Sequence, residues 1–333
     1  MIAGEQLAAW LGDKARQTSS YAAVQAFVGN WSAAPLMAEL TRELGAMGSP
    51  TPPQVLAAAR HFFDRVGDIQ QFVAALIESS RRDPFFVPPV HPLTSDIHAG
   101  ILLFHHHELS IGLGVTGVDQ LAAKKAVRTG PASVGFTGAW NLFRYLKAGN
   151  AVLSWWEAPP IEAGFRSIDA GQCRRTGTRR LADGDEILLD GSRESFIIDH
   201  ADGDILYLHA LVRSGAAPLT AEYDSDTRRF IGATSTDEAS SRVQMMVTLL
   251  REMDREDAVP VLRDFLANPH FYTRWHVMRE LLALDAEAVL PDLRRMATDD
   301  PHPEVRAAAS QTLTLFFAEA SEPVVEDLEA CHA

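Results

Sequence analysis

The chain has 333 residues, 47% of them hydrophobic, a formal net charge of −14 and a sequence pI near 5.3. This length is typical of two or three domains. The acidic balance argues against nucleic acid or an anionic membrane as partner, because binding phosphate groups requires a basic surface.

Residues 1–17 are amphipathic and carry Glu5 and Asp13, so they lack the basic start and continuous apolar core of a secretory signal. No apolar run approaches the roughly 18–20 residues needed to cross a bilayer. The two cysteines, Cys173 and Cys331, indicate neither a disulfide framework nor a paired metal motif. We therefore expect a soluble cytoplasmic protein.

Residues 1–82 are predicted to form a helical N-terminal domain. Apolar residues recur there at helical spacing, as at Val55, Ala59, Phe62 and Val66. Residues 83–100 are rich in proline, which fixes φ and removes a hydrogen-bond donor, so we expect a linker.

Residues 101–235 are predicted to form a β domain of short antiparallel strands. Turn signals such as Asp183-Gly184, Asp190-Gly191 and Asp202-Gly203 separate the apolar runs and favour hairpins, because glycine adopts positive φ without steric cost. This pattern is typical of a sandwich, a jelly roll or a barrel. The expected strands are 101–115, 132–136, 142–146, 151–156, 186–189, 195–199, 205–212, 219–223 and 229–233.

Residues 236–320 are predicted to be a helical repeat, because Arg242, Arg274 and Arg306 recur 32 residues apart. The stretch 300–309 resembles the inter-helix turn and second helix of HEAT-type repeats. Such units bury their apolar faces only by stacking. Residues 236–333 carry nine arginines, no lysine and 19 acids, which suits a protein or peptide partner better than nucleic acid. Residues 321–333 form an acidic tail. The predicted fold class is therefore α+β and multidomain.

The stretch 101–115 holds three consecutive histidines inside an apolar run. If it is one strand, His105 and His107 point to the same face. Two such imidazoles could bind iron or another divalent transition metal. His209, in the strand 205–212, is the preferred third ligand, and His98 and His200 are alternatives. The other interpretation is that these histidines form hydrogen bonds at a strand edge or are simply exposed.

Aromatic residues on the predicted strands are candidates for lining a small-molecule pocket. We single out Trp140, Trp155 and Tyr207. Aromatic residues at strand spacing also form ordinary cores, and this alternative stays open.

Residues 181–198 resemble the second conserved motif of the cupin superfamily. Gly184-Asp185 matches the entry into a strand and Asp190-Gly191 approximates the tight turn, but Ser195 stands where a metal-binding histidine is expected. The set Gly100, His105, His107 and Gly117 is similar to the first cupin motif, without its glutamate. The resemblance implies a cupin-like β-barrel or jelly roll.

Two functions are compatible with these patterns. In the first, the cupin-like domain binds or senses a small molecule, and the helical repeat contacts a protein. The alternative is a metal-dependent, non-haem iron oxygenase with His105, His107 and His209 as ligands, acting on a small molecule, a peptide or a carrier-bound substrate. The serine at position 195 favours the first function, and the predicted histidine pair favours the second.

Overall fold

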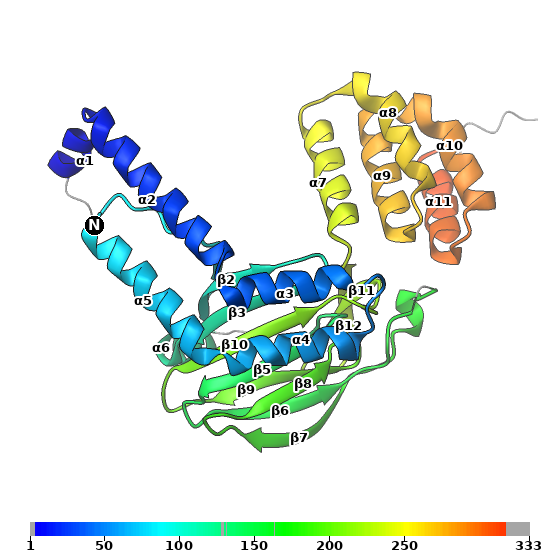
Figure 1. Cartoon of the computed structure of the whole chain (residues 1–333). Coiled ribbons are helices and arrows are strands. Elements are labelled where there is room, and N and C mark those ends of the chain that lie inside the picture. Colours follow the sequence, from blue (N-terminus) through cyan, green and yellow to red (C-terminus); the bar gives the residue numbers. More distant parts are fainter. Residues whose placement is uncertain (1–3, 128–129, 131, 163, 318–333) are drawn as a thin grey trace, which may run out of the picture. The chain divides into compact units, whose positions relative to one another are not determined.

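The computed structural model describes residues 4–127, 130, 132–162 and 164–317, which divide into two compact units (Figure 1). The first unit extends to Thr234. The second contains the helices after Ser235 together with residues 164–166. The N-terminal helices belong to the same compact unit as the β strands.

Five helices precede the strands of the first unit. The fourth begins at two prolines, as expected for a first helical turn, and Thr51 and Gln54 close a capping box at this end. The second and fifth helices pair through aromatic contacts, with the Trp31 and Phe72 ring centroids 4.0 Å apart. The five helices are α1 (Gly4–Leu11), α2 (Lys14–Ser32), α3 (Pro35–Ala46), α4 (Pro52–Asp64) and α5 (Val66–Arg82).

The strands form one six-stranded and two three-stranded sheets, and the described residues include no closed barrel. The largest sheet is antiparallel throughout, in the order β1-β2-β3-β10-β5-β8. Its strands are β1 (Pro92–Thr94), β2 (His98–His105), β3 (Leu109–Thr116), β5 (Trp140–Lys147), β8 (Glu186–Asp190) and β10 (Ile205–Val212).

The two smaller sheets have the orders β7-β6-β9 and β12-β11-β4. Helix α6 (Val118–Val127) joins β3 to β4, and a short 3-10 helix, Ser167–Asp169, precedes β7. The strands of these sheets are β4 (Ser133–Phe136), β6 (Val152–Glu157), β7 (Arg174–Arg180), β9 (Glu194–His200), β11 (Leu219–Asp224) and β12 (Phe230–Ser235).

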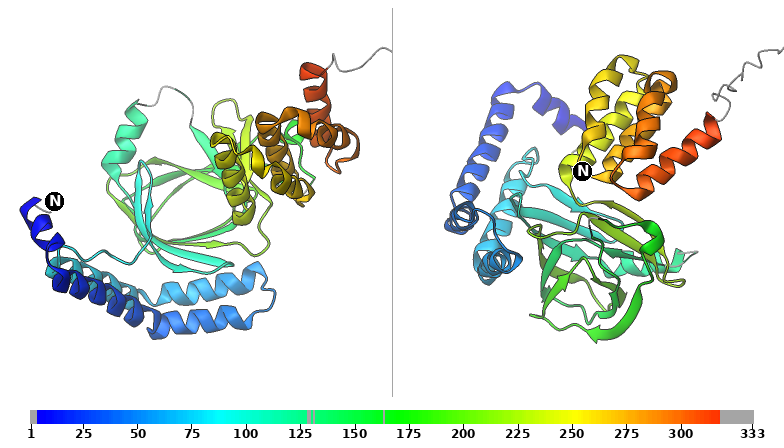
Figure 2. Two further views of the ribbon diagram at one scale, coloured as in Figure 1. Left: turned by 90° about the horizontal axis from the view of Figure 1, so that it is seen from above. Right: turned by 90° about the vertical axis from the view of Figure 1, so that its right-hand side faces the viewer.

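The six-stranded sheet has a core on each face, because alternate residues of a strand point in opposite directions. On β10, Leu208, Ala210 and Val212 are buried in the core that contains helices α3–α5. Ile205 and Tyr207 point the other way, into a core shared with the β7-β6-β9 sheet. Figure 2 shows helices α3–α5 along one side of the six-stranded sheet and the β7-β6-β9 sheet across the other.

The stretch 101–115 is a hairpin rather than the single strand that we predicted. Strand β2 ends at His105, and β3 begins at Leu109. The amide of His106 donates to the carbonyl of Leu109, which closes the turn between them. His107 therefore lies in the turn and does not share a strand face with His105.

Strand β7 forms one edge of its sheet, and every residue of it is exposed. Its arginines form ion pairs with acidic residues of neighbouring segments. These pairs join Arg174 to Glu157, Arg175 to Asp199 and Arg179 to Asp185.

The second unit is a stack of helices. Its α-helices are α7 (Glu238–Glu252), α8 (Val259–Arg263), α9 (Phe271–Leu284), α10 (Ala286–Asp299) and α11 (Pro303–Phe316), with 3-10 turns at Glu256–Ala258 and Asp264–Ala267. The predicted tail, residues 321–333, lies outside the described residues. No helix in the described part of the chain has the length and apolar character that a membrane span requires.

A buried ion pair connects successive parts of this stack. Arg274 on α9 donates from Nε and Nη2 to the two carboxylate oxygens of Asp300, at 2.8 and 2.7 Å. The Arg274 and Asp300 side chains are only 7% and 4% exposed. Asp300 also accepts the amide of His302 at 2.8 Å, and its carbonyl accepts from Arg306. The repeating arginine thus fixes the turn between α10 and α11.

Candidate functional site

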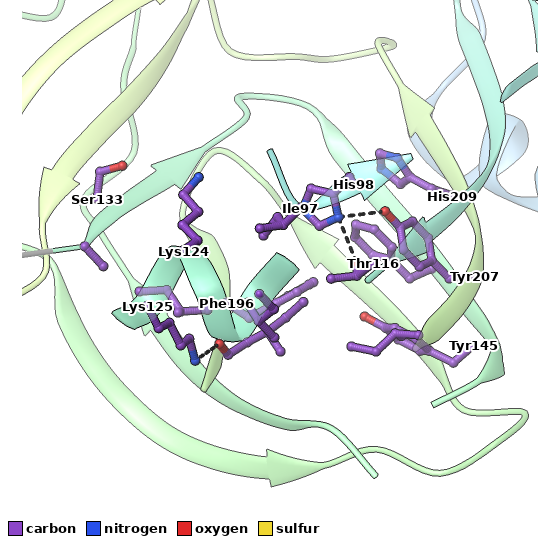
Figure 3. A pocket seen from close by; sticks show the side chains of 16 residues that line it. Ile97, His98, Thr116, Lys124, Lys125, Ser133, Tyr145, Phe196, Tyr207 and His209 are labelled. Carbon is purple, nitrogen blue, oxygen red and sulfur yellow. Dashed lines mark hydrogen bonds between the residues drawn. The ribbon is translucent and has the colours of Figure 1, made fainter. Parts of the chain in front are cut away.

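A cavity of about 670 Å³ lies against the inner face of the six-stranded sheet. Strands β2, β3, β5 and β10 supply one wall, β9 another, and helix α6 lies at its edge (Figure 3). Its lining is mainly apolar and aromatic. The lining residues are Ile97, His98, Thr116, Leu121, Lys124, Lys125, Ala132, Ser133, Phe143, Tyr145, Phe196, Ile197, Ile198, Ile205, Tyr207 and His209.

A glycine in β3 makes room for the Tyr207 ring, which lines the cavity. A Cβ atom on Gly114 would lie 2.7 Å from the Tyr207 ring, closer than real Cβ contacts come. Gly112 stands directly opposite His209 in the β3–β10 register, and a Cβ atom there would lie 2.9 Å from the Leu93 side chain of β1. Gly114 thus lets the Tyr207 ring of β10 lie over the β3 backbone.

His98 begins β2 and forms a polar cluster in the cavity with Thr116 and Tyr207. Its Nδ1 lies 2.7 Å from Thr116 Oγ1 and 3.4 Å from the Tyr207 hydroxyl (Figure 3). Burial, together with the nearby positive charge of Lys124, lowers the pKa of His98. Burial also raises the pKa of Tyr207, so the phenol stays protonated and neutral.

His209 on β10 is the second imidazole of the cavity. Its Nε2 lies 3.0 Å from Oδ1 of Asn141, whose amide nitrogen donates to Thr137 Oγ1 and to the Ala139 carbonyl. Because Oδ1 can only accept, His209 Nε2 carries the proton and Nδ1 is left as an acceptor. Burial lowers the pKa of His209 to about 4, so the ring is neutral at pH 7. The ring also stacks on Phe143, with centroids 4.3 Å apart.

The structure does not bring the three predicted metal ligands together. His105 is exposed at the end of β2 and contacts Ser110 Oγ at 3.0 Å. His107 lies in the following turn with its side chain 76% exposed, whereas His209 faces the cavity two strands from His105. Within the described ranges, no group of three or more histidine, cysteine or acidic residues has the geometry to hold a metal ion. The predicted set therefore does not fit a metal centre, because the run that carries two of its members folds as a hairpin.

The three predicted ligand-binding aromatics occupy different environments. Tyr207 lines the cavity. Trp155 packs beside the inner core and lies 6.2 Å from the Phe196 ring, but it is not among the lining residues. Trp140 packs against the core on the opposite face, with helices α3–α5. The alternation of β5 explains this, because Phe143 and Tyr145 take the inward positions.

Ser195 stands where the resemblance to the cupin motif predicts a histidine, and it does not line the cavity. Its hydroxyl donates to the Gly135 carbonyl of β4 at 2.6 Å, and the residue is 8% exposed. The next residue, Phe196, faces the cavity instead. Ser195 thus ties β9 to β4.

Of the residues that line the cavity, sequence reasoning selected Tyr207 and His209 and named His98 only as an alternative metal ligand. It placed His98 in the linker 83–100, although β2 begins there. Lys124 lies on α6, which the β pattern of this region concealed. The available signal was the alternation of Asn141, Phe143 and Tyr145 along one strand face, which places all three on the side of His209.

The second unit matches a known family of helical repeats. Residues 232–314 match the family model for HEAT repeats. The HEAT-like repeat predicted from the sequence is thereby confirmed. The Arg274–Asp300 pair lies within the matched region. No curated protein sequence matches the chain.

Solved structures similar to this chain include several cupins. A cupin domain from Bordetella pertussis Tohama I aligns at 7% identity and a TM-score of 0.23, over 36% of this chain and 98% of its own. Ectoine synthase from P. lautus aligns at 9% identity and a TM-score of 0.23, over 44% of this chain and 85% of its own. A cupin-superfamily sugar phosphate isomerase from Silicibacter pomeroyi aligns at 12% identity and a TM-score of 0.24, over 43% of this chain and 79% of its own.

Proposed function

We propose that the cupin-like part of the chain binds a small molecule in the cavity of the six-stranded sheet. The supporting observation is the lining of this cavity. Aromatic walls supply apolar contact area, and neutral His98, His209, Tyr145 and Tyr207 offer a few oriented hydrogen-bonding groups. Small-molecule sites in proteins have this combination of an apolar lining and sparse polar groups.

The test uses N-phenylnaphthylamine, a neutral apolar dye whose fluorescence rises on burial. We expect saturable, stoichiometric binding to the full chain. Phe196→Ala removes one aromatic wall and should weaken binding about tenfold, because a buried phenylalanine contributes about 1.5–3 kcal/mol. Trp140→Ala is the matched control, since it removes an aromatic residue from the opposite face of the sheet. Equal losses in both variants, or no saturable binding, would contradict the proposal.

The HEAT repeat is proposed to contact a basic protein. Its support is the charge of residues 236–333 and an apolar face on α7. Met246 and Leu249 are 64% and 57% exposed, although their repeat equivalents Met278 and Leu281 are fully buried. A synthetic amphipathic helix with an arginine-rich polar face is a suitable probe. We expect salt-dependent binding that the double substitution Met246→Gln and Leu249→Gln abolishes, and binding that is insensitive to this substitution would refute the contact.

A metal-dependent oxygenase is the alternative proposal. In its favour, His98 and His209 bring two imidazoles to one cavity. Against it, Asn141 occupies Nε2 of His209, and the described residues supply no complete ligand set. Elemental analysis of protein purified without a metal-affinity tag decides between the two. Stoichiometric iron that is lost in His209→Ala would support the oxygenase.

A further inference from the structure

The charge of the cavity lining has the opposite sign to that of the whole chain. The sequence contains 44 acidic residues against 30 lysines and arginines. Among the described residues that line the cavity, however, the only charged side chains are Lys124 and Lys125, and none is a carboxylate. The sequence contains only four lysines in all, so half of them lie here. This lining favours a ligand that carries negative charge.

The two lysines have different roles. Lys125 is held by the protein, because its Nζ donates to the carbonyls of Ile198 and Asp199. Lys124 lies one residue earlier on α6, and its Nζ is 3.3 Å from a carboxylate oxygen of Asp96. Asp96 is 80% exposed and Lys124 53%, so this ion pair is a weak surface contact that a ligand can replace. Lys124 is therefore the charge available to a ligand.

The cavity that Lys124 lines also contains the neutral imidazole of His98 and the aromatic rings of the strands. Figure 3 shows Lys124 on α6 and His98 on β2, with Ile97 between them, beside the aromatic residues of the cavity. In the same cavity, Phe143 and Phe196 meet edge to face with centroids 5.4 Å apart. A ligand that satisfies both regions has an apolar body and one anionic end.

We propose that the cavity binds an apolar acid, with its ring system against the wall formed by Phe143, Phe196 and Tyr207 and its acidic group on Lys124 beside His98. This inference rests on the proposed binding function and names the chemical class of its ligand. An acidic group paired with an ammonium forms a charge-assisted hydrogen bond, which is stronger than a neutral one. Lys124 would thus select acids over neutral molecules of the same shape.

The experiment compares two dyes of nearly the same shape on the full chain. Anilinonaphthalene sulfonate carries an anionic group, and N-phenylnaphthylamine lacks it. We expect the sulfonate to bind about tenfold more tightly at low salt, and Lys124→Met to remove this preference without changing the affinity for the neutral dye. Lys147→Met is the matched control. It removes the same charge at an exposed site on β5, where Lys147 pairs with Asp183.

Each outcome has a distinct meaning. Loss of the sulfonate preference in Lys124→Met but not in Lys147→Met supports the apolar acid. If the neutral dye binds and the sulfonate binds no better, or if Lys124→Met leaves the preference intact, the acid is wrong while the binding function stands. If neither dye saturates, the binding function itself fails. Circular dichroism of both variants confirms that the fold is retained.

Discussion

Replacing Asp300 by alanine should loosen the HEAT repeat strongly. The substitution removes two short hydrogen bonds from Arg274 and the acceptor for the His302 amide, and it leaves a guanidinium that is only 7% exposed without its counter-ion. Breaking one partner of a buried ion pair costs about 3–5 kcal/mol. If the free energy of local opening falls by about 4 kcal/mol, the backbone amide hydrogens of these helices should exchange roughly a thousandfold faster.

Hydrogen exchange followed by mass spectrometry measures this loss locally, in peptides from α9 to α11. The matched control is Glu238→Ala, because Arg242 occupies the same repeat position as Arg274 but pairs with Glu238 at the surface, where the side chains are 72% and 64% exposed. An exposed pair contributes about 0–1 kcal/mol. Similar protection losses in the two variants would show that burial does not govern the strength of this pair, and would refute the reasoning.

The same pair sets a dependence on pH. Burial alone would raise the pKa of Asp300, but the hydrogen bonds from Arg274 and the His302 amide hold it below its usual value. A carboxylate with a lowered folded-state pKa stabilises the fold above its unfolded pKa of about 3.9, and this contribution is lost as the pH falls further. The helical repeat of Asp300→Asn should lose that acid sensitivity.

Three further predictions concern the β domain. Because the pKa of His209 is lowered to about 4, the unfolded chain takes up a proton at this residue at higher pH than the folded chain does. The free energy of unfolding should therefore fall by up to about 3 kcal/mol as the pH decreases from 6.5 to 4. Urea titrations measure this slope, and His209→Gln should flatten it. Ser195→Ala should cost about 1–2 kcal/mol in the same assay, whereas Ser195→Thr should retain the bond to Gly135; an unchanged midpoint in the alanine variant would contradict the tie between β9 and β4. Gly114→Ala should displace the Tyr207 ring, costing about 1–3 kcal/mol and weakening dye binding, and wild-type affinity would refute the contact.

Much of the β domain could be predicted, because short apolar runs between Asp-Gly turns specify strands locally. The predicted strand 205–212 coincides with β10, and most others differ by one or two residues. The helical repeat was visible for a similar reason, since its period repeats the same side chains at the same positions. Both signals depend on neighbours in sequence.

The site was harder to predict because it depends on which face each strand residue takes. The apolar run around the three histidines contains no glycine or proline at its turn, so the sequence predicts one continuous strand where the chain folds as a hairpin. That error placed His107 beside His105. His98 was harder to place, because its partners Thr116 and Tyr207 are distant in sequence and meet it only across the sheet.

The exposed strand β7 has a consequence for how the chain behaves in a concentrated solution. Its outer side offers unpaired backbone amides and carbonyls, on which a strand of another molecule can add to the sheet. Four arginines in seven residues oppose this, because a second copy aligned against the same strand would bring like charges together. A segment with no apolar residue to bury thus protects this sheet edge against edge-to-edge aggregation. Removing its charge would leave the edge open to pairing without altering the interior of the fold.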